Sequence, residues 1–429
     1  MIGESARDST AHSAWGSAAW GYWVVTIFAV VLAVAVGFPG GAEVADSECY
    51  RLLAEGHVEL VVQPFSNRQL EPLLVRVLAD FLHMTTGRSF EVLALVSTIV
   101  CVGGVGYILY RSQASLRLYA AAALLPVWAS FDHGYLLPDI FYSALLTVFL
   151  LCLWRKSYWL AAALLLPLYV SREAAILVLV CLLIAGVRFL RTRVMVGATV
   201  AATAGALISH ALARGSQSNV HHLPAVLYLI GKVPFNFMQN VVGIAPWVNT
   251  LRPVGPPFWI YHIPSWLHLG AIKVIGICPF HLEYPVRTLL GWMGGFGILP
   301  LVLCVSMRGG QLRTVWNDFF FRFCILYGVI SFIAGPLLGS SVSRLILHGW
   351  PAFLIALPLI WPLGLQHKVG LIIANFLSGW TAFAVSEVQV KNHVLLPLYG
   401  AFAVVLACWI FAILDIRCKD DLMAGGRVN

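Results

Sequence analysis

Long runs of apolar residues, separated by short polar segments, are the dominant pattern along this chain of 429 residues. About twelve of these runs approach the length that a helix needs to cross the roughly 30 Å hydrocarbon core of a bilayer. They lie near 21–38, 89–110, 117–131, 139–154, 157–170, 174–190, 194–213, 285–305, 316–338, 345–363, 369–386 and 394–414. Because backbone polar groups in lipid must be satisfied within their own segment, the pattern predicts an all-α, multi-pass integral membrane protein. The fifth and sixth runs are short, and a break is expected around 171–173.

One further periodic segment, 70–82, is too short and too charged to span. Its apolar residues recur at helical spacing and share one face, namely Leu70, Leu73, Leu74, Val77, Leu78, Phe81 and Leu82, whereas Glu71, Arg76 and Asp80 fall on the opposite face. This spacing is typical of an amphipathic helix, which we expect to lie flat in the membrane interface on the outer face. The alternative is that the segment begins the next spanning helix with a kink.

Basic residues set the expected orientation, since short cytoplasmic loops are enriched in Lys and Arg. With both termini cytoplasmic, the short inner loops and the C-terminus hold Arg111, Arg117, Arg155, Lys156, Arg188, Arg191, Arg193, Arg308, Arg313, Lys368, Arg417, Lys419 and Arg427. The composition agrees with a membrane protein, because 60% of residues are hydrophobic and only 11% are charged. The net charge of +8 therefore reflects topology, and its scatter between spans argues against a nucleic-acid surface.

The pattern divides the chain into three parts. An N-terminal membrane module, 1–213, contains a first outer loop at 39–88, in which a short helix is expected from Asp46 to about Glu55. A large outer loop follows at 214–284, rich in Pro, Trp, Tyr and His, where repeated prolines forbid long helices and favour short helices and re-entrant pieces. The remaining spans occupy 285–429. A structured loop as long as 214–284 is uncommon unless it is functional.

Ionisable residues outside the basic inner loops gather at the predicted outer face. Asp46 and Glu48 follow the first span directly, and Asp139 begins the fourth span after Pro138. A transported ion would instead require ionisable residues at mid-membrane depth, where these spans are nearly free of charge. Nucleotide-binding glycine motifs are absent from the sequence. We therefore expect the chemistry to lie where the outer leaflet meets water.

These features resemble the glycosyltransferase C superfamily, the multi-pass enzymes that use polyprenyl-phosphate sugars. The resemblance covers about the first 175 residues: a retained first helix, the acidic D-x-E of Asp46 and Glu48, an interface helix beginning R-x-L-x-P-L-L at Arg68, and the Pro138–Asp139 step. It implies a catalytic carboxylate near the end of the first helix, with Asp46 at the matching position and Glu48 as its alternate. The chain departs from many members in having D-x-E and no soluble C-terminal domain.

The reaction that this resemblance implies has simple chemical needs. A base takes the proton from the acceptor hydroxyl, and cations hold the departing lipid phosphate. Guanidinium groups suit phosphate geometry. The candidates for donor binding are Arg68, Arg172, Arg344 and Lys232, with Asp139, His281 and Arg287 as secondary site candidates.

Each of these candidates also has a structural alternative. Asp46 and Asp139 are equally suited to capping helices. Arg172 and Arg344 are equally suited to snorkelling or to pairing with an outer acid such as Glu173. The sequence leaves open whether Asp46 or Glu48 is the base and whether a divalent metal takes part, and no other cofactor is expected.

Two rival functions remain open on the sequence. An O-antigen polymerase- or ligase-like enzyme would use residues of the large outer loop, such as Arg252, His262, His281 or Arg287, and Asp46 would be incidental. A transporter or lipid flippase would need polar residues at the midplane and related halves.

The glycosyltransferase hypothesis specifies the partners and the location. The partners are a polyprenyl-phosphate-linked sugar, a lipid, glycan or protein acceptor, and membrane lipids, with no nucleic acid. The location is a bacterial inner membrane, where an oxidising outer side would permit Cys49 to pair with Cys278, against the alternative of two unrelated thiols. The sugar, the acceptor and the oligomeric state are left open by the sequence.

Overall fold

The computed structural model describes residues 46–113, 134–217, 316–338 and 342–352, with short stretches at 24, 26–28, 30–31, 127–128, 131, 233–244, 259–262, 274–277, 285, 288–289 and 291. The helices are α2 (Ser47–Glu55), α3 (Leu70–Leu82), α4 (Thr86–Gln113), α7 (Asp139–Trp154), α8 (Tyr158–Ser171), α9 (Ala175–Gly186), α10 (Thr192–Leu212), α15 (Phe319–Leu338) and α16 (Val342–Leu347). Shorter elements are η1 (Val58–Leu60), η2 (Phe65–Asn67), the π-helical turn η3 (Met238–Val242), and strands β1 (Trp259–His262) and β2 (Val274–Ile277).

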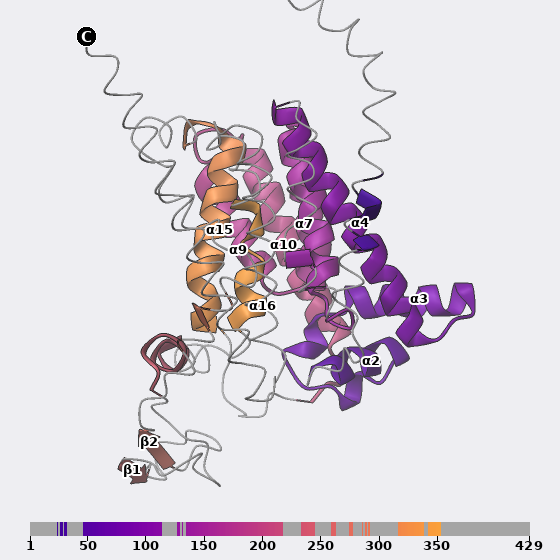
Figure 1. The fold of residues 1–429 in the computed structure, drawn as a ribbon, viewed down its shortest axis with the longest axis vertical. Coiled ribbons are helices and arrows are strands. Elements are labelled where there is room, and N and C mark those ends of the chain that lie inside the picture. The colour runs from indigo at the N-terminus through magenta and orange to yellow at the C-terminus, as the bar shows by residue number, and fades with distance from the viewer. Residues whose placement is uncertain are drawn as a thin grey trace, which may run out of the picture.

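The long helices α4, α7, α8, α9, α10 and α15 run side by side as a bundle, while α2 and α3 lie across one of its ends (Figure 1). Helix α8 packs on α10 and α7, α4 packs on α7, and α15 packs on α9 and α16. The predicted helical class is therefore confirmed for this part of the chain.

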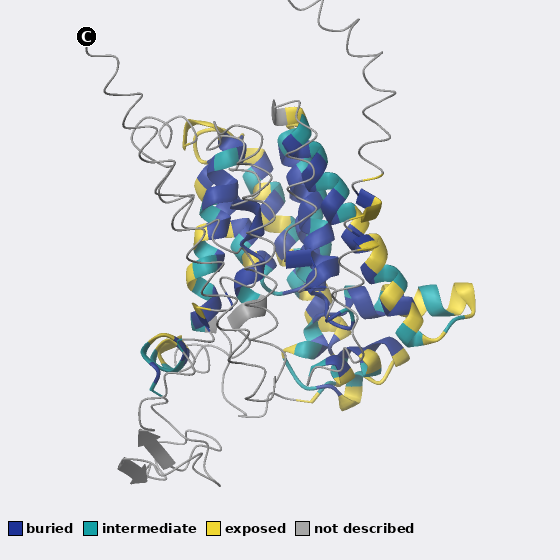
Figure 2. Cartoon of the chain, in the orientation of Figure 1, coloured by how far each residue is buried: buried dark blue, intermediate teal, exposed yellow. Residues whose placement is uncertain are grey.

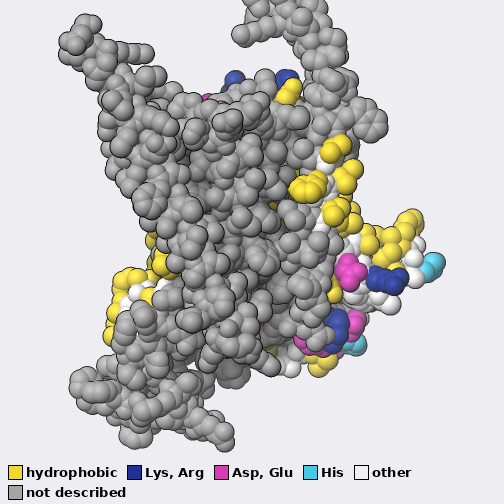
Figure 3. Space-filling view, viewed as in Figure 1, with side chains coloured by type: hydrophobic (Ala, Val, Ile, Leu, Met, Phe, Trp, Pro, Cys, Tyr) yellow, Lys and Arg dark blue, Asp and Glu magenta, His cyan; other side chains and the backbone are white. Residues whose placement is uncertain are grey.

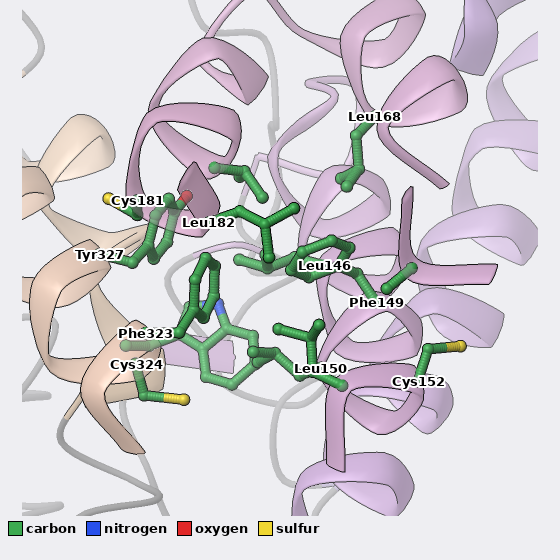
Figure 4. Close-up of a cluster of buried hydrophobic side chains, with 14 of the residues drawn as sticks. Leu146, Phe149, Leu150, Cys152, Leu168, Cys181, Leu182, Phe323, Cys324 and Tyr327 are labelled. Carbon is green, nitrogen blue, oxygen red and sulfur yellow. The ribbon is translucent and has the colours of Figure 1, made fainter. Parts of the chain in front are cut away.

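Aromatic side chains fill the centre of the bundle. Phe149 of α7 meets Phe323 of α15 with ring centroids 5.5 Å apart, and Tyr327 stacks on Phe323 one turn further along (Figure 4). Leu146 and Leu150 of α7 complete the same layer and are fully buried. Because lipid tails are as apolar as these side chains, close van der Waals packing holds such helices together.

Small residues let two helix pairs approach closely. A Cβ atom at Gly205 of α10 would lie 2.8 Å from the backbone oxygen of Leu166 in α8. A Cβ atom at Gly328 of α15 would lie 2.0 Å from the Cβ of Ala352, beyond α16. Glycine at these positions therefore permits the contacts that fix α10 on α8 and the α16 segment on α15.

Three of the described helices are long and apolar enough to cross a membrane: Thr86–Arg111, Thr192–Leu212 and Phe319–Leu337. Helices α7, α8 and α9 are apolar but shorter. Several large apolar side chains of α10 are exposed, including Val196, Val200 and Leu207. Outward apolar side chains on a long helix are typical of lipid contact, so the helices support membrane association.

Several predicted elements agree closely with the structure. The expected span at 139–154 is α7, the amphipathic segment 70–82 is α3, and the expected break at 171–173 separates α8 from α9. The expected spans at 369–386 and 394–414 lie outside the described residues. Those at 21–38, 117–131, 285–305 and 345–363 are described only in part, as are the first outer loop before Asp46 and the C-terminal part 285–429.

The two predicted outer regions meet beside the bundle. Val62, in the first outer loop, forms a bridge with Gln217, at the start of the 214–284 region. A side-chain hydrogen bond from Ser66 to Ser216, at 3.1 Å, joins the same regions. Ser209, near the end of α10, donates to the backbone oxygen of Asn67 in the first loop. Both regions therefore lie at the same end of the bundle, as the predicted topology requires.

The large outer region also contains an element that the sequence did not predict. Strands β1 and β2 pair antiparallel, with Trp259 opposite Ile277 and His262 opposite Val274. Repeated prolines exclude long helices from this region, and the two short extended segments pair with each other instead. The expectation of short helices here is met by the π-helical turn η3.

Candidate functional site

A group of buried charged side chains gathers at the end of the bundle that carries α2 and α3. The group consists of Arg68, Glu71, Asp139, Arg172, Glu173 and His348, which come from four separate segments of the chain. We call this group the charge cluster. Apart from Glu173, its members are less than 9% exposed.

Asp139 and Arg172 form the inner half of the charge cluster. A guanidinium nitrogen of Arg172 donates to Oδ1 of Asp139, and the same carboxylate oxygen lies 2.9 Å from Nε2 of His348. That imidazole nitrogen is also 2.7 Å from Nη1 of Arg172. Buried groups of opposite charge are expected to pair in this way, because an isolated buried charge is costly.

Local sequence positions each of these three groups. Pro138 takes the N-cap position of α7, so Asp139 falls in the first turn, where the helix dipole favours a carboxylate. Helix α8 ends at Ser171, and Arg172 continues in extended conformation, which turns its side chain back toward α7. His348 follows α16 and packs between the rings of Phe131 and Tyr142, at 5.3 and 5.1 Å between centroids.

Arg68 and Glu173 form the outer half. Nε of Arg68 donates to Glu173 at 2.8 Å, Nη2 donates to the other carboxylate oxygen, and Nη1 donates to the hydroxyl of Tyr50 at 2.7 Å. Burial acts to raise the pKa of Glu173, but the charge and hydrogen bonds of Arg68, with Arg172 behind, lower it to about 2. Glu173 keeps 44% of its side chain exposed, so the charge cluster reaches solvent at this pair.

Glu71 is the remaining acid. It lies in the first turn of α3 and is 1% exposed, and its Oε2 has no hydrogen-bond partner among the described residues. The backbone N–H of Gln69 donates to the carbonyl of Val170 at 3.1 Å, which ties the start of α3 to the end of α8. Burial raises the pKa of Glu71 to about 8, although the positive charge of Arg172 acts against this shift. Glu71 is therefore mainly protonated at neutral pH.

The two acids after the first span lie at the start of α2. Asp46 takes the N-cap position of α2 and is partly exposed, yet its side chain makes no capping hydrogen bond to that helix. Glu48 is 55% exposed and pairs with Arg51 on the same helix. Asp46 precedes Tyr50 by one helical turn, and Tyr50 contacts Arg68, so the start of α2 is linked to the charge cluster.

The structure brings together some of the predicted residues and leaves others undescribed. Arg172 and Asp139 are in direct contact. The sequence offered Glu173 only as an alternative partner for Arg172, and it offered an N-cap role as the alternative for Asp139, a position that Pro138 takes. Lys232, Arg252, His281 and Arg287 lie outside the described residues, and Arg344 and His262 are described only in their backbone. Cys49 carries a free thiol. Its predicted partner Cys278 lies outside the described residues, so the pairing stays a prediction.

Sequence reasoning missed the role of Glu71. The helical spacing placed Glu71 on the polar face of α3, which suggested contact with water. In the structure the first residue of this polar face, Glu71, is buried. The exposed residues are instead on the apolar face, namely Leu74, Val77, Phe81 and Leu82. The signal that was present is the nearby Arg68, because a buried arginine attracts acids to the same site.

Among the described residues, no three His, Cys, Asp or Glu side chains come together as a metal site. The chemistry that the charge cluster offers is that of two buried guanidiniums, Arg68 and Arg172, next to carboxyl groups. Comparison with known proteins gives no match, since no family model matches the chain and no curated protein is detectably similar to it in sequence.

Proposed function

We propose that this protein is a membrane enzyme that transfers a sugar from a polyprenyl-phosphate donor to a lipid, glycan or protein acceptor at the outer face of the membrane. The observation that carries this proposal is the buried pair of arginines, Arg68 and Arg172, at the foot of a helix whose apolar face is exposed. A lipid phosphate needs both a cation and an adjacent lipid-facing surface. The proposed architecture has about twelve spans, with both termini cytoplasmic, in a bacterial inner membrane.

Helix α3 supplies the lipid-facing side of this arrangement. Figure 3 shows hydrophobic side chains gathered over α3 and α4, with charged side chains at their edge. Gln69 alone separates Arg68 from the start of α3 at Leu70. A prenyl chain lying along the exposed face of α3 would therefore carry its phosphate toward the arginines.

The reaction balances with the groups that this site offers. A carboxylate takes the proton of the acceptor hydroxyl, whose oxygen forms a bond to the anomeric carbon of the sugar. The bond from that carbon to the phosphate oxygen breaks, and its electron pair stays on the polyprenyl phosphate. Arg68 and Arg172 would stabilise the charge that develops there. Asp46, one turn from Tyr50, is the candidate base, and Glu48 is its alternate.

The positions of ionisable residues favour an enzyme over a transporter. Helix α7 has one such side chain among Asp, Glu, Lys, Arg and His, which is Asp139 in its first turn, and α8 and α9 have none. A transported ion or a flipped headgroup would need polar groups within the spans. An O-antigen ligase-like reaction would instead use residues of the 214–284 region and Arg287, so variants of these residues test that alternative.

The test is a transfer assay on the purified protein in liposomes, supplied with polyprenyl-phosphate sugars and candidate acceptors. Asp46→Asn is expected to lower kcat by about 10²–10⁴, the usual range for loss of a general base. Glu48→Gln tests the alternate base, which pairs with Arg51 at the surface. Glu55→Gln changes an exposed carboxylate at the end of α2 and is the matched control, which should retain activity.

Two results would contradict the proposal at different levels. Full activity in both Asp46→Asn and Glu48→Gln would show that neither acid is the base. Failure of the wild-type protein to transfer from any polyprenyl-phosphate sugar, together with activity that His281→Ala abolishes, would favour the ligase-like alternative.

A further inference from the structure

Among the described residues, Glu71 is the buried carboxyl group of the charge cluster that pairs with no basic side chain. Arg172 is already paired with Asp139, and Arg68 is already paired with Glu173. The two guanidiniums are thus matched by two carboxylates before Glu71 is counted. A third negative charge would be in excess at this place.

The surroundings of Glu71 give it no second cation in the described part of the chain. Its Oε2 is buried without a hydrogen-bond partner, and Arg172 is the charge that acts on it. A buried carboxylate that lacks a partner is costly, and such a group takes a proton instead. The same geometry favours a neutral Glu71, which keeps the charge cluster free of an excess negative charge.

We propose that Glu71 is a positioning residue that holds a proton beside Arg172, so that the site binds a phosphodiester anion together with this proton. The inference rests on the proposed function and specifies how its donor is recognised. With Glu71 protonated, a phosphodiester with one negative charge can approach the arginines. With Glu71 ionised, the charge cluster has a net excess of negative charge and repels the same anion.

The donor class makes this linkage measurable. A polyprenyl-phosphate sugar is a phosphodiester, which keeps a single negative charge throughout the neutral and alkaline range. Any change in its affinity between pH 7 and 9 therefore comes from the protein. Because binding favours protonated Glu71, affinity is constant below the pKa of Glu71, about 8, and falls as pH rises beyond it.

Other titratable groups face the same place and must be separated from Glu71. They are Asp139 on α7, Glu173 between α8 and α9, His348 after α16, Tyr50 on α2, and the two arginines. Arg76 and Asp80 lie further along α3 itself and are exposed. His348 is the group whose loss of a proton with rising pH would act in the same direction, so it needs its own variant.

The experiment measures the Kd of a defined probe, the methyl diester of a short-chain prenyl phosphate, for the full-length protein in nanodiscs from pH 6 to 9. For the wild type, affinity should weaken about tenfold between pH 7 and pH 9, as uptake of one proton at a pKa of about 8 requires. Glu71→Gln should bind with little dependence on pH over this range. The amide copies the shape and neutrality of the protonated acid, so this variant is expected to fold.

Two controls complete the design. Glu91→Gln changes an exposed carboxylate on α4 and should keep the tenfold weakening. His348→Gln should also keep it, which assigns the proton to Glu71. A melting temperature recorded for each variant at pH 7 separates loss of binding from loss of fold.

The outcomes distinguish this inference from the proposed function. A wild-type Kd that is flat with pH, a Glu71→Gln protein that keeps the weakening, or a weakening abolished by His348→Gln overturns the proton linkage alone. Failure of the probe to bind at every pH overturns the proposed function as well.

Discussion

Arg172 is the residue on which the candidate site depends. It contacts Asp139 and His348, and its charge acts on Glu71 and Glu173. A guanidinium with several fixed donors can hold such partners in a plane, which the ammonium of a lysine cannot do. Because Arg172 lies in the turn between two apolar helices, its position depends on the ends of both.

The pair of Asp139 and Arg172 should contribute strongly to stability when one partner is removed. Asp139→Asn leaves a buried guanidinium without its carboxylate and is expected to lower the free energy of unfolding by about 3–5 kcal/mol. The measurement is denaturant-induced unfolding in mixed detergent micelles. Glu48→Gln, which breaks the exposed pair with Arg51, is the control and should change stability by no more than about 1 kcal/mol. Equal stability of the two variants would contradict this assignment.

The sequence predicted which charged residues belong to the site, but it did not predict which of them are in contact. Asp139 and Arg172 stand out in the sequence because each is a charged residue beside a long apolar run. Their contact joins residues 33 positions apart, and His348 comes from 176 positions beyond Arg172. Spacing along the chain gives no information on such contacts, since they depend on which helix ends meet.

At the scale of elements, α3 has two faces with unexpected surroundings. Its apolar face is largely exposed, with Val77 at 63% and Phe81 at 79%, whereas Glu71, Pro72 and Val75 on other sides are buried. Figure 2 shows the far end of α3 projecting from the rest of the protein. An exposed apolar face on a projecting helix fits a helix lying in the membrane interface.

This arrangement predicts opposite effects for two sides of α3. Replacing both Val77 and Phe81 with Ser should change the free energy of unfolding in detergent by no more than about 0.5 kcal/mol, because neither packs on protein. Val75→Ser should lower it by about 2 kcal/mol or more, since Val75 is fully buried. Thermal unfolding of the three proteins checks this, and a larger loss in the double variant would show that the apolar face packs on protein.

At the scale of the whole molecule, the bundle places its charges at its two ends. Arg155 and Lys156 lie in the turn between α7 and α8, and Arg172 and Glu173 lie in the turn at the other end of α8. The basic turn fits the cytoplasmic side, and the charge cluster fits the outer side. Residues 62 and 217, from the two predicted outer regions, pair at the same end of the bundle as the charge cluster.

Reporter fusions test this topology directly. Alkaline phosphatase, which is active only in an oxidising outer compartment, should be active when fused after Glu59 and inactive when fused after Lys156. A fluorescent-protein reporter that matures only in the cytoplasm should give the reverse result at the same two sites. The opposite pattern would place the charge cluster on the cytoplasmic side and contradict the proposed donor site.

The sequence by itself determined the helical class, the positions of α3 and α7, and the break between α8 and α9. These features follow from hydrophobic periodicity and from the cost of burying charge, which act locally along the chain. Tertiary structure decided that the apolar face of α3 points away from the bundle, that Arg172 pairs with Asp139, and that Glu71 is buried beside them. Such features depend on which helix ends pack together, and packing joins residues that no local pattern relates.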